Sequence, residues 1–205
     1  MNEIESWEIK GYTLEYIDST HQYLVNGVIV PSITQIIKME FGNKYDGIPK
    51  EVLNRAAQKG TEMHLAIELY EKEGKETDIP ELKNYKFLKK HYKWEVVESE
   101  IPIILFHEGK PIAGGRLDQI IKINDDLGIN DLKRTATFDK NYVATQTNLY
   151  RLGYQQSYDK EIKFVSGLHL RDKTRKFYRL PINEKYTTEV IEKYLKGRSE
   201  DARQC

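Results

Sequence analysis

The sequence has almost no cysteine and no long apolar run. Its one cysteine is Cys205, so no disulfide can form within the chain and no cysteine cluster can hold zinc or an iron–sulfur cluster. No apolar segment approaches the roughly 20 residues of a membrane span, and the N-terminal segment MNEIESWEIK lacks the apolar stretch of a signal peptide. We therefore expect a protein without a membrane partner that stays in the cytoplasm.

Charge gives no strong indication of a partner, because 32 basic and 32 acidic side chains balance to a formal net charge of zero. Nucleic-acid-binding domains are often basic overall. A neutral chain can still bind phosphates through local basic patches, and a Mg²⁺ enzyme needs acids. Charged residues make up 31% of the 205 residues and hydrophobic ones 39%, which suits one folded domain over 1–205.

Hydrophobic periodicity predicts a short N-terminal hairpin region followed by mixed helices and strands. Helices are expected over 33–39, 50–73, 81–93, 140–159 and 184–196. Strands are expected over 12–17, 22–25, 28–30, 96–106, 112–123, 127–133, 161–170 and 176–180. These elements divide the chain into a hairpin and short helix within 1–45, a core over 50–180, and a C-terminal helix and tail over 184–205.

Two aspartates are expected to face each other on one hairpin. A two-residue turn at Asn124-Asp125 pairs residues whose numbers sum to 249, which puts Asp118 opposite Asp131. Alternate strand residues share a face, so Lys133 projects beside Asp131. Opposed carboxylates repel unless a cation lies between them, and Mg²⁺ prefers carboxylate oxygens. The pattern predicts a metal site with an ammonium group alongside; the alternative is a pair of exposed acids on a twisted hairpin.

Glycine residues precede the first of these acids. Gly114 and Gly115 lie in the strand that carries Asp118, and glycine inside a strand marks a bulge or a close approach by a ligand or another backbone. A scissile phosphate strand is one candidate for that space, and a bend in a curved sheet is the other interpretation.

Two predicted helices carry further polar residues at one-face spacing. Gly60 and His64 lie four apart, so His64 is a candidate to contact a metal or a phosphate, although a solvated or core histidine is the more ordinary interpretation. Gln146 and Tyr150 are also four apart, and they are candidates to reach a phosphate or to stack on DNA.

The motifs occur in a fixed order along the chain: Gly60-x-x-x-His64, Gly115-x-x-Asp118, Asp131-x-Lys133 and Gln146-x-x-x-Tyr150. This order resembles the RecB-type branch of the PD-(D/E)XK nuclease superfamily, to which the lambda exonuclease-like phage nucleases also belong. The resemblance covers residues 50–170. Each motif alone is short and common. The resemblance is specific because all four motifs occur in this order, on helices and strands of the expected type.

The resemblance implies a restriction-endonuclease-like α/β fold, with a mixed sheet of four to five strands flanked by helices. It implies that Mg²⁺ or Mn²⁺ is bound by Asp118, Asp131, the Leu132 carbonyl and His64. Lys133 would orient or polarise the attacking water. The iron–sulfur cluster of some members needs four cysteines, which this chain lacks.

The resemblance also assigns supporting roles. Gln146 and Tyr150 would contact DNA or support the site, and Glu100 is a candidate further acid. The basic residues expected to hold the DNA backbone are Arg116, Arg134, Arg171, Lys173, Arg175 and Lys176. Such contacts carry affinity without sequence information, so we expect weak sequence preference.

The sequence departs from the family pattern at two positions. The second acid is Asp131 rather than the more frequent glutamate, and Arg134 follows the lysine where a small hydroxyl residue is often found, with Thr135 coming next. Both departures are expected to weaken the metal geometry without removing it.

The function expected from the sequence is a Mg²⁺-dependent DNA exonuclease in recombination or end-processing. Its partners would be DNA and a single-strand annealing protein, and its location the host cytoplasm if it is phage-encoded. The alternatives are a structure-specific endonuclease, an inactive nuclease-fold module that binds DNA or protein, and a structural or regulatory protein whose motifs coincide by chance.

Overall fold

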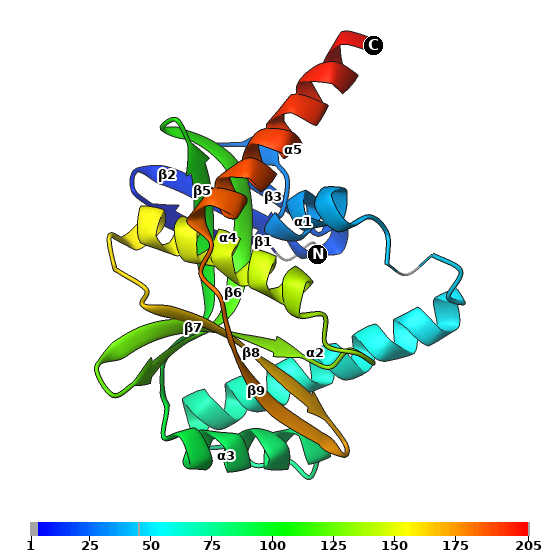
Figure 1. Cartoon of the computed structure of the whole chain (residues 1–205), viewed down its shortest axis with the longest axis vertical. Helices are drawn as coiled ribbons and strands as arrows, with labels where there is room; N and C mark the ends of the chain where they lie inside the picture. Colours follow the sequence, from blue (N-terminus) through cyan, green and yellow to red (C-terminus); the bar gives the residue numbers. More distant parts are fainter. Residues whose placement is uncertain (1–3, 45, 205) are drawn as a thin grey trace.

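The computed structural model describes residues 4–44 and 46–204, with side chains as far as residue 198, and Cys205 lies outside this part (Figure 1). The strands are β1 (Ile4–Ile9), β2 (Tyr12–Ile17), β3 (Gln22–Val25), β4 (Val28–Val30), β5 (Glu95–His107), β6 (Lys110–Ile123), β7 (Asp126–Lys133), β8 (Phe164–Arg171) and β9 (Thr174–Leu180). The α-helices are α1 (Ile33–Phe41), α2 (Lys50–Glu73), α3 (Pro80–Tyr92), α4 (Lys140–Tyr158) and α5 (Glu184–Gln204). A 3₁₀ turn covers Asp18–Thr20.

The strands form two sheets. β1, β2, β3 and β4 make an antiparallel sheet in sequence order, and β5 to β9 make a second sheet in which only β7 and β8 run parallel. Parallel neighbours need a crossover connection, which α4 supplies between these two strands. The expected α/β class, a mixed sheet flanked by helices with an N-terminal hairpin region, is confirmed.

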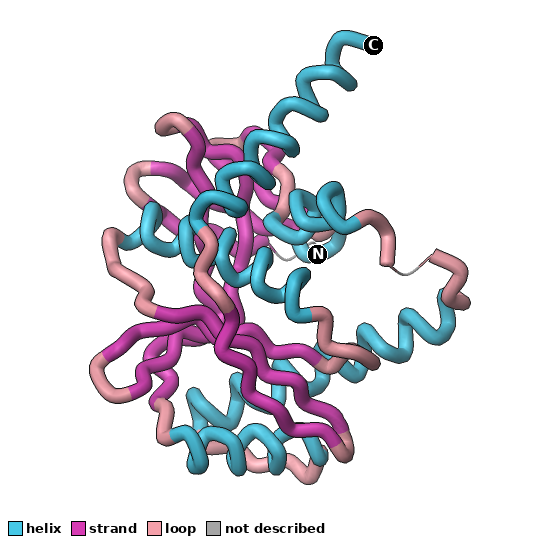
Figure 2. Tube along the Cα trace, viewed as in Figure 1, coloured by secondary structure: helices cyan, strands magenta, loops and turns pink. Residues whose placement is uncertain are grey.

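Helices cover both faces of the five-stranded sheet (Figure 2). Neighbouring residues of β6 point to opposite faces: Ile120 joins the core formed with α1, α4 and α5, whereas Ile121 joins the core formed with α2 and α3. A smaller cluster, which includes Leu14 and Ile104, joins the N-terminal sheet to β5. The five-stranded sheet therefore has an apolar core on each of its faces.

Local sequence signals explain the ends of several elements. The Ser32 hydroxyl accepts from the Gln35 N–H while the Gln35 side chain accepts from the Ser32 N–H, a capping box that begins α1. At the turn between β3 and β4, Asn26 and Gly27 both adopt positive φ, 49° and 75°, as a type I′ turn requires. The β6–β7 hairpin pairs Gln119 with Asn130, which is the predicted register.

The structure corrects several predicted boundaries. β1 was not expected, and it pairs with β2 along its whole length. β8 begins at Phe164 rather than at residue 161, because its pairing with β7 starts there, where Phe164 lies opposite Gly128. β9 begins at Thr174, so Arg171 and Arg175 pair within strands instead of forming the turn. α5 continues to Gln204 instead of ending at 196.

None of the helices in the described ranges is long and apolar enough to cross a bilayer.

Replacing Gly128 by alanine should destabilise the fold. A Cβ at this position would lie 2.2 to 2.4 Å from three ring atoms of Phe164, and an overpacked core costs about 1–3 kcal/mol. Urea unfolding should therefore show a lower free energy of unfolding for Gly128→Ala. The matched control is Gly60→Ala in α2, where nothing lies within 4 Å of the added carbon; this change should stabilise by up to about 1 kcal/mol. Equal effects of the two changes would contradict the packing described.

Candidate metal centre

The site lies where β6 and β7 part. Their paired residues end at Gln119 and Asn130, although both strands continue. Asp118, which precedes Gln119 in β6, turns its carboxylate into the gap between the two strands. Its Oδ2 accepts a hydrogen bond of 2.6 Å from the Leu132 N–H. One side-chain oxygen thus replaces the missing backbone acceptor, and the other oxygen, Oδ1, remains available.

His64 reaches the same gap from α2. Its Nε2 lies 3.1 Å from the Leu132 carbonyl oxygen, and because a carbonyl only accepts, Nε2 carries the proton in this contact. In the neutral ring, Nδ1 then has a free lone pair, and it lies 3.7 Å from Asp118 Oδ1. A carboxylate oxygen and an imidazole nitrogen that face each other in this way suit a cation between them.

Glu100, on β5, is a third candidate metal ligand. It lies between the pairs Ser99–Gln119 and Ile101–Leu117, so it is opposite Asp118. Its φ of 54° is in the left-handed region, a backbone conformation that costs about 1–3 kcal/mol and is often found at functional sites. Among the described residues, donor atoms of His64, Glu100 and Asp118 all lie within 4.8 Å of one another. Two ligands bound to one ion at about 2.1 Å are at most about 4.2 Å apart, so small side-chain adjustments bring the three onto one cation.

Asp131 and Lys133 form an ion pair next to this group. The Lys133 ammonium lies 2.8 Å from Asp131 Oδ1 and 2.7 Å from Oδ2, and it hydrogen-bonds to Oδ1. The Asp131 side chain is only 3% exposed, and its Oδ2, although close to the ammonium, has no aligned hydrogen-bond donor within the described chain. A buried carboxylate oxygen with an unused lone pair suits a ligand position as well.

The ionisation of these groups reflects their burial and crowding. Burial, with the charge of Asp118 as a second cause, raises the pKa of Glu100 to about 7, against the opposing effect of Arg116. Burial raises the pKa of Asp131 to about 6 although Lys133 opposes it. Burial alone would lower the pKa of Lys133, but the two aspartates outweigh it and raise that pKa. Glu100 and Asp131 therefore give up their protons less readily than exposed carboxyl groups do, because burial and the charge of Asp118 disfavour their ionised forms.

Two residues of α4, Tyr150 and Gln146, lie behind the acidic residues of the site. Both are buried, each 7% exposed, and burial raises the pKa of Tyr150 well above its usual value. The Tyr150 ring occupies the space that a Cβ on Gly115 would fill, at 2.9 Å. Their burial favours the supporting role among the two roles expected for them.

The two glycines of β6 make room for protein and not for DNA. Tyr23 would meet a Cβ on Gly114 at 2.8 Å, and Ile33 would meet one on Gly115 at 2.9 Å. The Gly114 N–H also donates to the Pro31 carbonyl at 3.0 Å. The suggestion that a phosphate strand uses this space is therefore wrong; the close approach is by neighbouring side chains and backbone.

Several basic residues expected at the DNA backbone are engaged by acids. Arg116 contacts Glu100 at 3.0 Å and Glu5 at 2.8 Å, so it orients a candidate ligand. Arg134 pairs with Glu81 at 2.6 Å and Asp172 at 3.1 Å, and its side chain is only 12% exposed. The structure thus gives both arginines a positioning role.

Of the remaining basic residues, Arg171 is half-buried and donates to the Ala136 carbonyl at 3.3 Å, and the other three stay exposed at the β8–β9 hairpin. Lys173 lies in the turn, and Arg175 and Lys176 follow it in β9. Because β8 runs parallel to β7 and pairs His169 with Lys133, this turn extends beyond the end of β7 that carries the site.

The metal that the donor set would hold is a hard divalent cation. Carboxylate oxygens and one imidazole nitrogen suit Mg²⁺ or Mn²⁺. The residues that fit are His64, Glu100 and Asp118, with Asp131 beside them. Of the sequence-based ligand set, the structure brings His64 and Asp118 together, and it adds Glu100 as a ligand candidate. Ligand roles for Asp131 and the Leu132 carbonyl stay predictions.

Two features of this arrangement were not foreseen. One is the Arg116–Glu100 contact, which depends on the register between β5 and β6 and has no local sequence signal. The other is the 3.1 Å contact of His64 with a backbone carbonyl. The i, i+4 spacing of Gly60 and His64 predicted the helix face but not the strand it meets.

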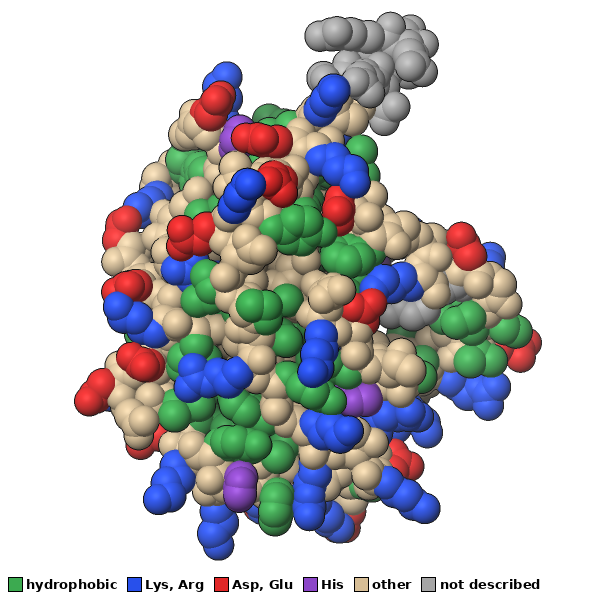
Figure 3. Space-filling view, in the orientation of Figure 1, with side chains coloured by type: hydrophobic (Ala, Val, Ile, Leu, Met, Phe, Trp, Pro, Cys, Tyr) green, Lys and Arg blue, Asp and Glu red, His purple; other side chains and the backbone are tan. Residues whose placement is uncertain are grey.

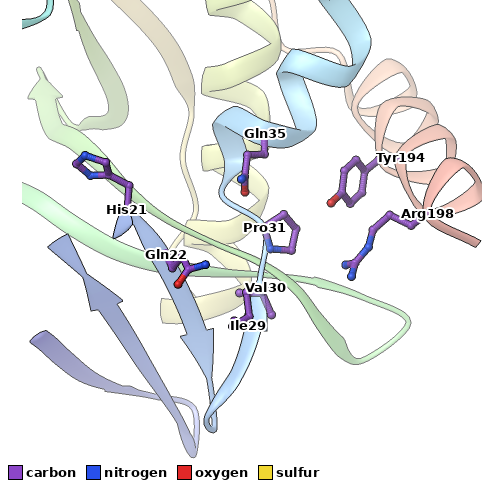
Figure 4. A pocket seen from close by; sticks show the side chains of 8 residues that line it. All are labelled: His21, Gln22, Ile29, Val30, Pro31, Gln35, Tyr194 and Arg198. Atoms are coloured by element: carbon purple, nitrogen blue, oxygen red, sulfur yellow. The ribbon is translucent and has the colours of Figure 1, made fainter. Parts of the chain in front are cut away.

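A cavity of about 320 Å³ lies elsewhere, between β4, α1 and α5 (Figure 4). It is lined by His21, Gln22, Ile29, Val30, Pro31, Gln35, Tyr194 and Arg198. None of the metal-centre residues lines it, so the cavity and the metal centre are separate features of the molecule.

Comparison with known proteins gives little further information. No family model matches the chain, and no curated protein matches it. Among solved structures, one described as "Crystal structure of SSO0001" is similar with a TM-score of 0.47 and 15% identity, over 81% of this chain and 75% of that chain. A likeness at this level assigns neither family nor activity.

The metal-free protein should lose stability as the pH rises from about 4.5 to about 7, the range over which Glu100 holds its proton only in the folded state. A raised carboxyl pKa means that the folded chain binds more protons than the unfolded chain, so deprotonation favours unfolding. Glu100→Gln should reduce this fall in the free energy of unfolding, measured by urea titration in EDTA. Glu98→Gln, on the same strand and paired with Lys160 at 3.4 Å, is the control. An unchanged pH profile in Glu100→Gln would contradict the burial described for this carboxyl group.

Proposed function

We propose that this protein is a divalent-metal-dependent deoxyribonuclease of the PD-(D/E)XK type that degrades DNA from its ends. The observation that carries the proposal is the convergence of three candidate ligands, His64, Glu100 and Asp118, beside the buried Asp131–Lys133 pair. The order of the sequence motifs and the α/β fold support it. Mg²⁺ or Mn²⁺ would be the cofactor.

Each residue has a definite task in phosphodiester hydrolysis. A bound divalent ion supplies a water of lowered pKa and neutralises charge that develops on the phosphate. Asp118 and Glu100 provide the negative charge that binds such an ion. Their orientation is fixed, since Asp118 is held by the Leu132 N–H and Glu100 by Arg116. Nδ1 of His64 presents its lone pair toward the same space.

Lys133 provides the positive charge beside the reacting phosphate. Its ammonium is held by Asp131 and its side chain is 18% exposed, so one or more of its three N–H groups can reach a water or a phosphate oxygen. A preorganised cation of this kind stabilises a charged transition state without having to reorient during the reaction.

Removing the charge of Asp118 or of Lys133 should strongly reduce DNA cleavage. Asp118→Asn keeps an oxygen that can accept from the Leu132 N–H but removes the charge, and Lys133→Met keeps the apolar stem. Each should lower the rate of Mg²⁺-dependent degradation of linear DNA by about 10²-fold or more. The assay follows acid-soluble nucleotide release, with EDTA as the blank.

The control for this pair is Asp125→Asn, in the exposed turn of the same hairpin, which should retain full activity. Circular dichroism checks folding, because Lys133→Met leaves Asp131 buried without its partner, a change that costs about 3–5 kcal/mol. Undiminished cleavage by folded Asp118→Asn would refute the assignment.

Degradation from ends predicts a difference between linear and circular DNA. With Mg²⁺, end-labelled linear DNA should lose its label and shorten, whereas covalently closed circular DNA should persist over the same time course. Linearising the circle with a restriction enzyme should restore degradation. Prompt nicking of the intact circle would instead identify an endonuclease.

A further inference from the structure

An exposed row of aromatic rings runs along α3 and meets β9. Phe87 is 47% and Tyr92 39% exposed. The Phe87 and His91 rings are stacked, with centroids 6.1 Å apart and planes at 6°, and Tyr92 contacts His91 at 4.8 Å and Phe177 at 4.7 Å. We call Phe87, His91, Tyr92 and Phe177 the α3–β9 aromatic surface. Large exposed apolar groups that gather in one place mark binding sites.

Cations border this surface without acidic partners. The Arg175 guanidinium lies 3.7 Å from the centroid of the Phe87 ring. Arg175 and Lys90 are exposed, and neither has an ion pair within the described part of the chain. Two other lysines of α3 differ, since Lys83 and Lys89 pair with Asp78 and Glu71. Basic side chains gather over the lower end of the molecule, where α3 and the β8–β9 hairpin lie (Figure 3).

The surface is joined to the candidate metal centre by direct contacts. Arg134, which follows Lys133, binds Glu81 in the first turn of α3. Asn84 binds the Arg171 carbonyl at 2.7 Å, where β8 ends. Phe87 lies six residues beyond Glu81, which is about 9 Å along the helix axis at the usual rise. A polymer that leaves the metal centre along α3 therefore meets Phe87 first and then His91 and Tyr92.

We propose that the α3–β9 aromatic surface binds single-stranded nucleic acid, with bases packed against the exposed parts of the Phe87 and Tyr92 rings and phosphates paired with Arg175 and Lys90. Exposed aromatic faces interleaved with cations are the usual means by which single strands are held without sequence preference. A duplex hides its base faces and would use the cations alone. The inference rests on the proposed function in naming DNA as the polymer and in taking the metal centre as the point from which the strand leaves.

Binding is measured without catalysis. Fluorescence anisotropy of a 5′-labelled oligothymidylate, in EDTA, gives the affinity of the whole protein and its variants. Phe87→Leu and Tyr92→Leu keep apolar side chains but lose the ring, and each should weaken binding about fivefold to 150-fold, the range for loss of one stacked base. Phe87→Trp and Tyr92→Phe keep a ring and should bind as the wild type does. Ile29→Ala, an exposed apolar residue on β4, is the distant control.

Arg175→Gln tests the phosphate contact separately. The slope of log affinity against log salt concentration should become shallower by about 0.7, the value for one phosphate contact on a single strand. Phe87→Leu should leave that slope unchanged, because stacking releases no counterions.

Three outcomes would overturn the inference. The first is equal affinity of Phe87→Leu and wild type for oligothymidylate. The second is equally tight binding of a blunt duplex, which would indicate a purely electrostatic contact. The third is a polyglutamate peptide that binds with the same dependence on Phe87 and Tyr92, which would indicate an acidic protein partner. Failure of the nuclease proposal has a different signature, since the oligothymidylate would then bind as described while linear DNA stayed intact with Mg²⁺.

Discussion

The hydrogen bond from the Leu132 N–H to Asp118 Oδ2, 2.6 Å long, holds together the point where β6 and β7 diverge. A buried N–H that loses its strand partner must find another acceptor, or the fold loses about 1–3 kcal/mol. Asp118 provides that acceptor with a carboxylate, so the backbone requirement and the placement of a charge are met by one side chain. The Leu132 carbonyl, on the same side of β7, then meets His64. The separation of two strands thus determines where an acid and an imidazole converge.

The charge balance of the site follows from this geometry. Glu100, Asp118 and Asp131 provide three carboxylates, while Arg116 and Lys133 provide two fixed cations. Each cation is paired with a carboxylate that burial makes costly to ionise, and Asp118 has no such partner. Its remaining oxygen faces a histidine nitrogen at 3.7 Å. The carboxylate that lacks a lysine or arginine partner therefore lies beside a histidine nitrogen, and an oxygen and a nitrogen so placed suit a divalent ion.

Sequence patterns predicted those parts of the site that depend on local rules. The two-residue turn at Asn124-Asp125 determines the β6–β7 register, and the predicted pairing holds as far as Gln119–Asn130. It ends there, so Asp118 does not pair directly with Asp131 as expected, and its Oδ2 instead accepts from the Leu132 N–H. Glu100 could be placed only on a strand, because its position opposite Asp118 depends on the long β5–β6 pairing with its irregularities. β1 was missed because only its last residue, Ile9, is buried. The glycines of β6 were interpreted as space for DNA because sequence does not show that Tyr23 and Ile33 fill it.

A formal net charge of zero conceals a strong segregation of charge. From Arg171 to Leu180 there are five basic residues and one acid, Asp172, and that acid is taken up by Arg134. The acids that balance them lie elsewhere in the chain, among them Glu100, Asp118 and Asp131 at the metal centre and Glu68 and Glu71 in α2. Under the proposed function, a polyanion would meet this positive surface near a group of acids that repels it unless a metal is bound. Because the field of exposed charges falls off within about 10 Å at ordinary salt, this local pattern decides binding, and the net charge of the whole chain does not.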